Sequence, residues 1–569
     1  MKVSDFITTF LFKKNVTKCF SVTGGFAMHL NDSFGHKMNV TYTHGEQPAG
    51  YAALGWSSYE HNPSVCCVTS GCGATNAVTP CLIAYQDSVP IFFISGQVHR
   101  DDNIRTRGGK IRGYFGSDCD IIESVKGITK YAVELTDPKD TLKVLQECYN
   151  NLTTGRLGPV WLSVPVDVQS MEVPQMIEEW KAPREVSITS VPQEFIDVWT
   201  KAQRPIVLAG NGIHLSKTKV QFRKFLGHHK LPYVVSFFGS DLGNDYTGKT
   251  GLIGNRAGNF AIQNADLVLC LGSRMCKSIT GYKRNLFARE AKVVYLDIDE
   301  SEFIEDKKLD IKLQMNLKTF FDLELPELKM NPTWIQKNEE WRELWSEEMP
   351  EKNGELVCPY RHLNKFFKEK GGDSVVTMSS GSIYCVGWHM YRYKEGDRFI
   401  TSGHGDMGYE VASAMGASFH GKRTWVIVGD GSFQYNIQDL QTLKHYNLPV
   451  TILVFNNDGY GAIKITQDAV FKREYGTSSK SDLTFCNIEK VSKAYDIPYY
   501  KVEKDDDTEY LNDPKGPMIV EIVCNTQGRY PRLSNKPQPD GTFKNMPYEE
   551  MAPFLDDETL EKHMFVKRA

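Results

Sequence analysis

The stretch Thr424–Asn457 reads TWVIVGDGSFQYNIQDLQTLKHYNLPVTILVFNN, and it decides the fold. Two apolar, β-rich runs, Thr424–Val428 and Val450–Asn456, predict buried strands. Between them, four apolar residues recur at helical spacing: Phe433, Ile437, Leu440 and Leu443. A strand, a crossover helix and a second strand make the βαβ unit of a parallel sheet, so the stretch predicts an α/β protein.

Outward from this unit, short apolar runs alternate with helical patterns along most of the chain. Three blocks can be separated, which predicts three doubly wound parallel-sheet domains at 1–175, 190–330 and 358–530, followed by a C-terminal tail at 531–569. The other expected strands are Val40–His44, Ser64–Thr69, Ile91–Ser95, Val160–Val164, Pro205–Ala209, Tyr233–Ser236, Leu267–Leu271, Val293–Ile298, Ser374–Met378 and Met518–Ile522. Helices are expected at Trp334–Trp345 and from about Asp557.

Composition excludes several classes of protein. The 569 residues are 41% hydrophobic and 24% charged with a formal net charge of −4, so the basic excess of a nucleic-acid-binding protein is missing. No apolar run reaches the roughly 20 residues of a membrane span, and the N-terminus lacks a signal-peptide pattern. Thirteen scattered cysteines without a C-x-x-C pair indicate thiols in a reducing compartment. We therefore expect a cytoplasmic protein that binds neither nucleic acid nor membrane.

Two polar residues, Asp430 and Asn457, come directly after the two strands of the opening stretch. The carboxyl ends of parallel strands form the edge where open α/β sheets bind ligands. Mg²⁺ prefers oxygen ligands and usually takes some of them from a phosphate. Gly429 and Gly431 would let the backbone approach a diphosphate, and Ser432 could add a hydroxyl donor. The pattern predicts a divalent metal held beside a diphosphate.

The Gly429-Asp430-Gly431 turn, followed after residues 432–455 by Asn456-Asn457, resembles the signature of thiamine-diphosphate-dependent enzymes. The resemblance implies thiamine diphosphate and Mg²⁺ as cofactors. It also implies three metal ligands: Asp430, Asn457 and the backbone carbonyl of Gly459.

Other motifs resemble the pyrimidine-binding part of the same family. The segment His44–Ala52 reads HGEQPAGYA and resembles the motif of the activating glutamate, so Glu46 is implied as the catalytic residue that hydrogen-bonds the aminopyrimidine ring. The segment Ser70–Asn76 resembles S-G-P-G-A-T-N with Cys72 in place of proline, and Thr401–Tyr409 resembles the loop whose methionine supports the cofactor. The implied cofactor-binding residues are Gly24, Gly25, Thr75, Asn76, Gly381, Ser382, Gly405, Met407, Gly429, Gly431, Ser432, Tyr460 and Gly461.

Glu46 and Asp430 belong to different blocks. In this family the two halves of one site come from two subunits, so the resemblance implies a homodimer or homotetramer with shared sites. Three domains are implied: pyrimidine-binding, central Rossmann-like and diphosphate-binding.

Further matches resemble acetohydroxyacid (acetolactate) synthase, including Ala84–Pro90, Ser95–Val98 and Pro165–Gln169. That family decarboxylates pyruvate, a 2-oxo acid, and adds the two-carbon unit to a keto acceptor. This chain departs from it near the substrate: Ser117-Asp118 replaces a Gln-Glu pair, Ser382-Ile383 a Gln-His pair, and Thr466 a tryptophan. The smaller side chain leaves room near the acceptor. The run Asn456–Lys464 and the Pro-rich tail with Asp540-Gly541 resemble sugar-branching relatives of the synthases, which implies a nucleotide-linked 4-keto-deoxyhexose as acceptor. Three residues are candidates for substrate contact: Ser117, Thr466 and Gln467.

Binding of FAD in the middle block is left open by the sequence. Some members of the families that this sequence resembles hold a non-reacting FAD in that block. In this sequence, however, Gly272-x-Arg274 lacks the Asp pair that usually follows. A lone glycine turn at 210–212 is a weak signal, and an empty Rossmann-like domain explains it equally well. The residues that would hold FAD are Gly210, Asn211, Gly212, Arg256, Gly272 and Arg274.

Three alternatives to the sugar-branching carboligase remain open. One is a true acetolactate synthase of branched-chain amino-acid synthesis. Another is a 2-oxo-acid decarboxylase that releases an aldehyde, although the paired histidines of such enzymes are missing near Glu46. The third is a non-catalytic cofactor-binding subunit, against which the presence of Glu46, Asp430 and Asn457 argues.

Overall fold

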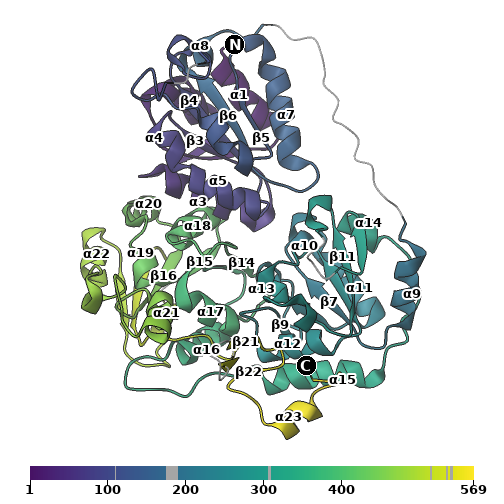
Figure 1. Ribbon diagram of the computed structural model, residues 1–569. Helices are drawn as coiled ribbons and strands as arrows, with labels where there is room; N and C mark the ends of the chain where they lie inside the picture. Colours follow the sequence, from purple (N-terminus) through teal and green to yellow (C-terminus); the bar gives the residue numbers. More distant parts are fainter. Residues whose placement is uncertain are drawn as a thin grey trace.

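The computed structural model describes the chain except for residues 109–110, 175–189, 305–308, 513–514, 534–535, 538–542 and 569. It has three lobes, each built around one sheet with helices on both faces (Figure 1). Each of these sheets has six strands, and every ladder in them is parallel. The predicted α/β class with three doubly wound sheets is confirmed.

The first lobe holds the sheet that begins the chain. Its strands are β1 (Lys18–Ser21), β2 (Asn39–Tyr42), β3 (Ser64–Val68), β4 (Ile91–Gln97), β5 (Tyr131–Glu134) and β6 (Val160–Pro165). They lie in the order β2-β1-β3-β4-β6-β5. The helices are α1 (Val3–Lys13), α2 (Met28–Lys37), α3 (Glu46–Glu60), α4 (Cys72–Asn76), α5 (Val78–Gln86), α6 (Ile121–Val125), α7 (Thr141–Thr153) and α8 (Val166–Ser170).

The central lobe has the strands β7 (Pro205–Ala209), β8 (Tyr233–Val235), β9 (Gly248–Lys249), β10 (Leu267–Leu271), β11 (Lys292–Asp297) and β12 (Ile311–Gln314). Their order is β12-β11-β10-β7-β8-β9, which is the 3-2-1-4-5-6 order of the Rossmann fold. The helices are α9 (Gln193–Lys201), α10 (Gly212–Leu215), α11 (Lys219–His229), α12 (Arg256–Asn264), α13 (Lys277–Thr280) and α14 (Leu317–Phe321); the helix expected at Trp334–Trp345 is α15 (Pro332–Leu344).

The third lobe has the strands β13 (Ser374–Thr377), β14 (Arg398–Ile400), β15 (Arg423–Gly429), β16 (Val450–Asn456), β17 (Tyr499–Val502) and β18 (Met518–Val523). The order β14-β13-β15-β16-β18-β17 repeats that of the first lobe. The helices are α16 (Pro359–Glu369), α17 (Gly381–Met390), α18 (Tyr409–Ser418), α19 (Asp430–Phe433), α20 (Leu440–His445), α21 (Gly461–Phe471) and α22 (Ile488–Ala494).

Every strand expected from an apolar run is present. In the three large sheets the sequence missed β1, which is short, internal and buried, and also β5, β9, β12, β14 and β17, which lie at sheet edges. An edge strand is buried less completely, so its sequence lacks a continuous apolar run. The residues of β5, for example, are all only half-buried.

The helix expected between β15 and β16 is broken. Asn436 has φ +61° and separates α19 from the turn Ile437–Asp439 and from α20. The apolar residues still face inward, because Phe433, Leu440 and Leu443 are buried. The break leaves a short first helix whose start lies at the end of β15.

The first and third lobes share one hydrophobic core. Helix α3 of the first lobe packs on α18 of the third so closely that a Cβ at Gly55 would overlap the carbonyl of Ser413. Likewise, a Cβ at Gly416 would overlap the carbonyl of Ala52. The helix that begins at Glu46 is therefore fixed rigidly against the third lobe.

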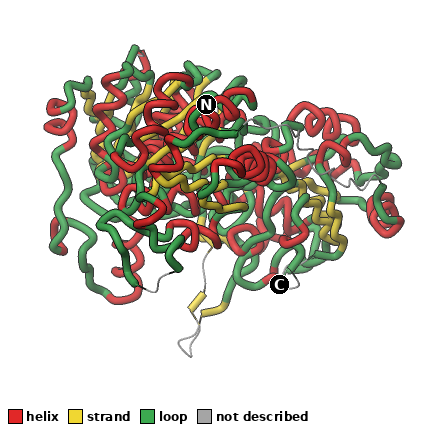
Figure 2. Tube along the Cα trace, turned by 90° about the horizontal axis from the view of Figure 1, so that it is seen from above, coloured by secondary structure: helices red, strands yellow, loops and turns green. Residues whose placement is uncertain are grey.

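The tail returns to the central lobe. Two short antiparallel ladders pair β19 (Arg532–Leu533) with β22 (Met551–Ala552) and β20 (Lys536–Pro537) with β21 (Phe543–Lys544), and α23 (Asp557–Lys562) follows. The β20–β21 ladder projects from the body in the view from above (Figure 2). Among the described residues, no helix has the length and apolar character that a membrane crossing requires.

Candidate functional site

A cavity of about 250 Å³ lies at the carboxyl edge of the third sheet, next to the ends of β13, β15 and β16. The chain reverses its direction of strand addition between β13 and β15, and ligands bind at such switch points. Twelve residues predicted to bind metal or cofactor line it: Gly381, Ser382, Gly405, Met407, Gly429, Asp430, Gly431, Ser432, Asn457, Gly459, Tyr460 and Gly461. The structure therefore brings the whole predicted diphosphate half together.

Asp430 is a buried carboxylate at this edge. Its Oδ1 accepts a hydrogen bond from the backbone N–H of Gly431 at 2.8 Å, and its Oδ2 accepts one from Gly459 at 2.9 Å. Burial raises the pKa of Asp430 to about 6, while the backbone donors act in the opposite direction. Burial makes the charged form of Asp430 unfavourable in the protein alone. A bound cation would stabilise that charged form.

Asn457 supplies the second oxygen. Its Oδ1 is buried and has no hydrogen-bond partner among the described residues, which is a costly state for a carbonyl-type oxygen. A cation beside Asp430 would satisfy it. No group of three His, Cys, Asp or Glu side chains suited to a metal occurs among the described residues, so the other ligands here would be amide, backbone and phosphate oxygens. The residues present fit Mg²⁺ held partly by a diphosphate.

The glycines at the cavity leave no space for a side chain. A Cβ at Gly431 would overlap the ring of Tyr460, and one at Gly459, whose φ is +151°, would overlap the carbonyl of Thr477. The Tyr460 ring in turn packs edge-on against Phe485 with the centroids 5.5 Å apart. These contacts hold the backbone of both loops at the cavity wall.

Ser432 differs from its expected role. Its hydroxyl donates to Oε2 of Glu410 at 2.7 Å and accepts from the backbone N–H of Gly408 at 2.9 Å. The hydroxyl hydrogen therefore points at Glu410 and not at a ligand in the cavity. Sequence reasoning missed Glu410, although it is the single charged residue of the buried helix α18.

The first lobe assembles the other half of the predicted site. Glu46 begins α3, and its Oε2 accepts a hydrogen bond from Nδ2 of Asn76 at 3.0 Å. A Cβ at Gly73 would lie 3.3 Å from Oε1 of Glu46, and one at Gly24 would overlap Thr69. Glu46, Asn76 and Gly24 thus lie close together, next to Thr75, whose hydroxyl donates to the carbonyl of Cys72, and to Gly25, which has open space around it.

The candidate substrate residues divide between these two halves. The carbonyl of Ser117 packs against Gly71 in the first lobe. Thr466 is exposed on α21, and its hydroxyl donates to the carbonyl of Ala462. Both amide atoms of Gln467 are hydrogen-bonded to the backbone of Tyr475, so this side chain holds a turn. Neither Glu46 nor Ser117 lines the cavity of the third lobe.

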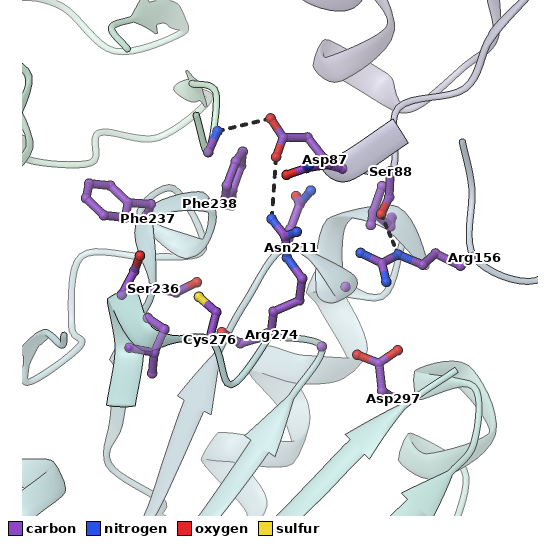
Figure 3. Close-up of a pocket in the computed structure, with 18 of the residues that line it drawn as sticks. Asp87, Ser88, Arg156, Asn211, Ser236, Phe237, Phe238, Arg274, Cys276 and Asp297 are labelled. Atoms are coloured by element: carbon purple, nitrogen blue, oxygen red, sulfur yellow. Dashed lines mark hydrogen bonds and ion pairs between the residues drawn. The ribbon is translucent and has the colours of Figure 1, made fainter. Parts of the chain in front are cut away.

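A larger cavity, about 630 Å³, lies at the carboxyl edge of the central sheet between the three lobes (Figure 3). Four of the residues predicted for FAD line it: Asn211, Gly212, Gly272 and Arg274. Gly210 does not, because it packs against Gly272 and Ser273. Arg256 is also misassigned: it is fully buried, forms an ion pair with Glu348 at 2.8 Å and donates to the carbonyls of Met551 and Pro553 in the tail.

Asp87 links this cavity to the loop that carries Met407. Its Oδ2 accepts a hydrogen bond from the backbone N–H of Gly403 at 3.0 Å, and its Oδ1 lies 3.5 Å from a guanidinium nitrogen of Arg274 (Figure 3). Burial raises the pKa of Asp87 to about 6. Gly405, two residues further along, lines both cavities.

Known families match all three lobes. The thiamine pyrophosphate enzyme N-terminal TPP binding domain matches residues 1–124, the central domain of the same enzymes matches 193–323, and their C-terminal TPP binding domain matches 379–521. The chain is 28% identical to acetolactate synthase 1, chloroplastic, of Nicotiana tabacum over 92% of its own length and 81% of the relative. It is also 28% identical to the acetolactate synthase isozyme 2 large subunit of Escherichia coli, over 85% of this chain and 88% of that one. For the acetolactate synthase large subunit of Lactococcus lactis, the identity is 28% over 89% of each chain.

Proposed function

The chain belongs to the thiamine pyrophosphate enzymes, as an acetolactate synthase-like carboligase, and from this premise we propose that it decarboxylates a 2-oxo acid, pyruvate, and adds the two-carbon unit to a ketone acceptor. The observation that carries the proposal is the cavity in which Asp430 and the unpartnered Oδ1 of Asn457 meet the glycine turn 429–431. When bound, thiamine diphosphate supplies the electron sink that such a decarboxylation needs.

We propose that the metal is Mg²⁺ and that the Asp430 carboxylate, the Asn457 side-chain oxygen and the Gly459 carbonyl hold it. The Gly459 carbonyl already accepts a hydrogen bond from the backbone N–H of Gly461 at 2.9 Å, and its second lone pair could bind the metal. The N–H groups at the start of α17 have no intrahelical acceptor and would face the diphosphate from Gly381 and Ser382. Met407, which also lines the cavity, would support the cofactor.

Glu46 is the proposed catalytic residue. Asn76 occupies its Oε2, which leaves Oε1 to share a proton with the aminopyrimidine ring. We propose that a homodimer, or a tetramer built from it, completes the site, because Glu46 does not line the cavity of its own chain. The exposed apolar side chains on α21 beside that cavity, Ile463, Val470 and Phe471, support a covering subunit.

The identity of the ketone that accepts the two-carbon unit is a separate part of the proposal. The relatives are named acetolactate synthases, which points to acetolactate as the product and therefore to a second pyruvate as acceptor. Thr466 favours a bulkier ketone, and for that we propose a nucleotide-linked 4-keto-deoxyhexose in branched-sugar synthesis. We place the reaction in the cytoplasm, in keeping with thirteen cysteines that all lie in described parts of the chain and form no disulfide.

Product analysis tests these assignments. The protein receives thiamine diphosphate, Mg²⁺ and pyruvate, with or without the keto-sugar nucleotide, beside Glu46→Gln. A branched sugar from the parent alone supports the sugar acceptor, and acetolactate alone supports the synthase. Free acetaldehyde alone would indicate a decarboxylase, and unconsumed pyruvate would reject the donor.

A second ligand is favoured by the central cavity. Its position at the switch point between β7 and β10 of a Rossmann-ordered sheet suits a dinucleotide, and we propose FAD. Asp297, at the end of β11, also lines the cavity and could accept from a ribose hydroxyl. Flavin absorbance of the purified protein, and flavin released on denaturation, test this assignment; a colourless protein that takes up no added FAD would refute it.

A further inference from the structure

Glu410 is a fully buried carboxylate directly behind the wall of the 250 Å³ cavity. Its Oε1 accepts hydrogen bonds from the backbone N–H of Ser380 at 2.9 Å and from the Ser380 hydroxyl at 2.7 Å. Its Oε2 accepts from the Ser432 hydroxyl at 2.7 Å. Two serines thus provide three donors to one carboxylate.

These serines belong to the two turns that meet at the switch point of the sheet. Ser380 follows β13 and is the N-cap residue of α17, whose first residues, Gly381 and Ser382, line the cavity. Ser432 follows β15 in the turn that contains Asp430, and it also accepts the N–H of Gly408. Glu410 therefore connects the ends of β13 and β15 with the start of its own helix, α18.

The chemistry at this position requires an acceptor. Burying a carboxylate costs free energy that an apolar side chain of similar size would not, so the charge needs a reason beyond packing. Both oxygens of Glu410 only accept, so they fix the direction of every donor around them. In particular, both serine hydroxyl hydrogens point at Glu410 and not at a ligand in the cavity, whereas the backbone N–H groups at the start of α17 remain available to one.

We propose that Glu410 is the positioning residue for diphosphate recognition: by accepting from Ser380 and Ser432, it sets the two turns at the spacing that a diphosphate spans. This inference rests on the proposed function and deepens it. Glu410 touches neither cofactor nor substrate in this assignment. It acts through the serines, so its effect falls on cofactor affinity and not on the chemical step.

Glu410→Gln is the sharpest test, because the amide keeps the shape but turns one acceptor into a donor. Calorimetric titration would measure the Kd of thiamine diphosphate and of inorganic diphosphate, each with Mg²⁺. The matched control is Ser413→Ala, which removes a buried hydroxyl that donates to the Glu410 carbonyl on the same helix but leaves both serines alone.

We expect both Kd values to rise at least tenfold in Glu410→Gln and to stay near the parent's in Ser413→Ala. Both variants should melt within a few degrees of the parent, and kcat at saturating cofactor should be retained, since only ground-state affinity changes. Unchanged Kd values for Glu410→Gln, or a lowered kcat with unchanged affinity, would overturn the positioning role. So would a parent that binds neither diphosphate. A parent that binds thiamine diphosphate but forms no carboligation product would overturn the proposed function and leave the role of Glu410 standing.

Discussion

Oδ2 of Asp430 lies 2.9 Å from the backbone nitrogen of Gly459, so the loop after β15 is hydrogen-bonded to the loop after β16. The two strands are in register up to the pair Gly429 and Phe455. Asp430 and Asn457 therefore leave adjacent strands within one residue of the same level. The geometry brings a carboxylate and an unpartnered amide oxygen to one point.

Replacing Asp430 with asparagine should abolish metal-dependent cofactor binding. The amide oxygen can still accept from Gly459, but the negative charge that a divalent cation needs is gone. We expect the Kd of thiamine diphosphate with Mg²⁺ to rise by at least two orders of magnitude, measured by calorimetry. Asp458→Asn, which removes an exposed acid in the same loop, serves as the control and should bind normally. Equal affinity in Asp430→Asn would remove this residue from the metal site.

Glu46→Gln should separate catalysis from binding. Gln keeps the bond from Asn76 but cannot share a proton with the cofactor ring, and such proton transfer contributes about 10²–10⁴-fold. We expect kcat to fall by a factor in that range while cofactor affinity changes only a few-fold. Glu60→Gln, at the exposed end of the same helix, is the matched control. Full activity in Glu46→Gln would mean that another group activates the cofactor.

The site motifs that directly follow a strand could be located from the sequence. An apolar run shows where a strand ends, and this does not require knowing the order of the strands in the sheet. Apolar runs identified β15 and β16, so the residues after them had to lie at one sheet edge. The same logic placed Glu46 after β2, in the first lobe.

Contacts between distant segments could not be predicted in this way. Arg256 was predicted to help hold FAD, but the tail, almost 300 residues further along, covers it. Ser432 was expected to face a ligand, and only the packing of α18 shows that Glu410 takes its hydrogen. A pattern in one segment carries no information about which other segment folds against it.

The contact between α3 and α18 predicts a stability effect. A Cβ at Gly55 would overlap the Ser413 carbonyl, and backbone cannot move aside as a side chain can. Gly55→Ala should therefore lower the free energy of unfolding by about 1–3 kcal/mol, the usual cost of overpacking. Gly227→Ala, in helix α11 with open space around it, is the control and should stabilise by up to about 1 kcal/mol. Urea unfolding measures both, and a neutral Gly55→Ala would show that the lobes separate easily.

Arg256 should hold the tail and not a flavin. Arg256→Gln leaves Glu348 without its cation and the carbonyls of Met551 and Pro553 without donors. Breaking such a buried pair costs about 3–5 kcal/mol. We expect faster proteolytic removal of the C-terminal tail and unchanged flavin content. A variant that loses flavin with an intact tail would restore the sequence-based assignment.

Asp87 should make stability depend on pH. Burial raises its pKa from 3.8 to about 6 in the folded protein, so folding takes up a proton between these values. The stability that this proton uptake by Asp87 contributes is complete below pH 4 and is lost as the pH rises through 6. Asp87→Asn removes this dependence, and its amide oxygen can still accept from Gly403.

Relative to the parent, Asp87→Asn should therefore gain stability between pH 4 and 7, by on the order of 3 kcal/mol for a shift of this size. Comparing the two proteins at each pH cancels the titration of other groups, and exposed Asp506→Asn controls for the loss of one charge. The charged groups that act on Asp87 are Arg274, Arg156 and Asp406, and they act on its charge in the parent alone. If the stability difference between the two proteins does not change with pH, Arg274 fully compensates the buried charge of Asp87. In that case Asp87 would be a permanent anion that ties the central cavity to the Gly403 loop.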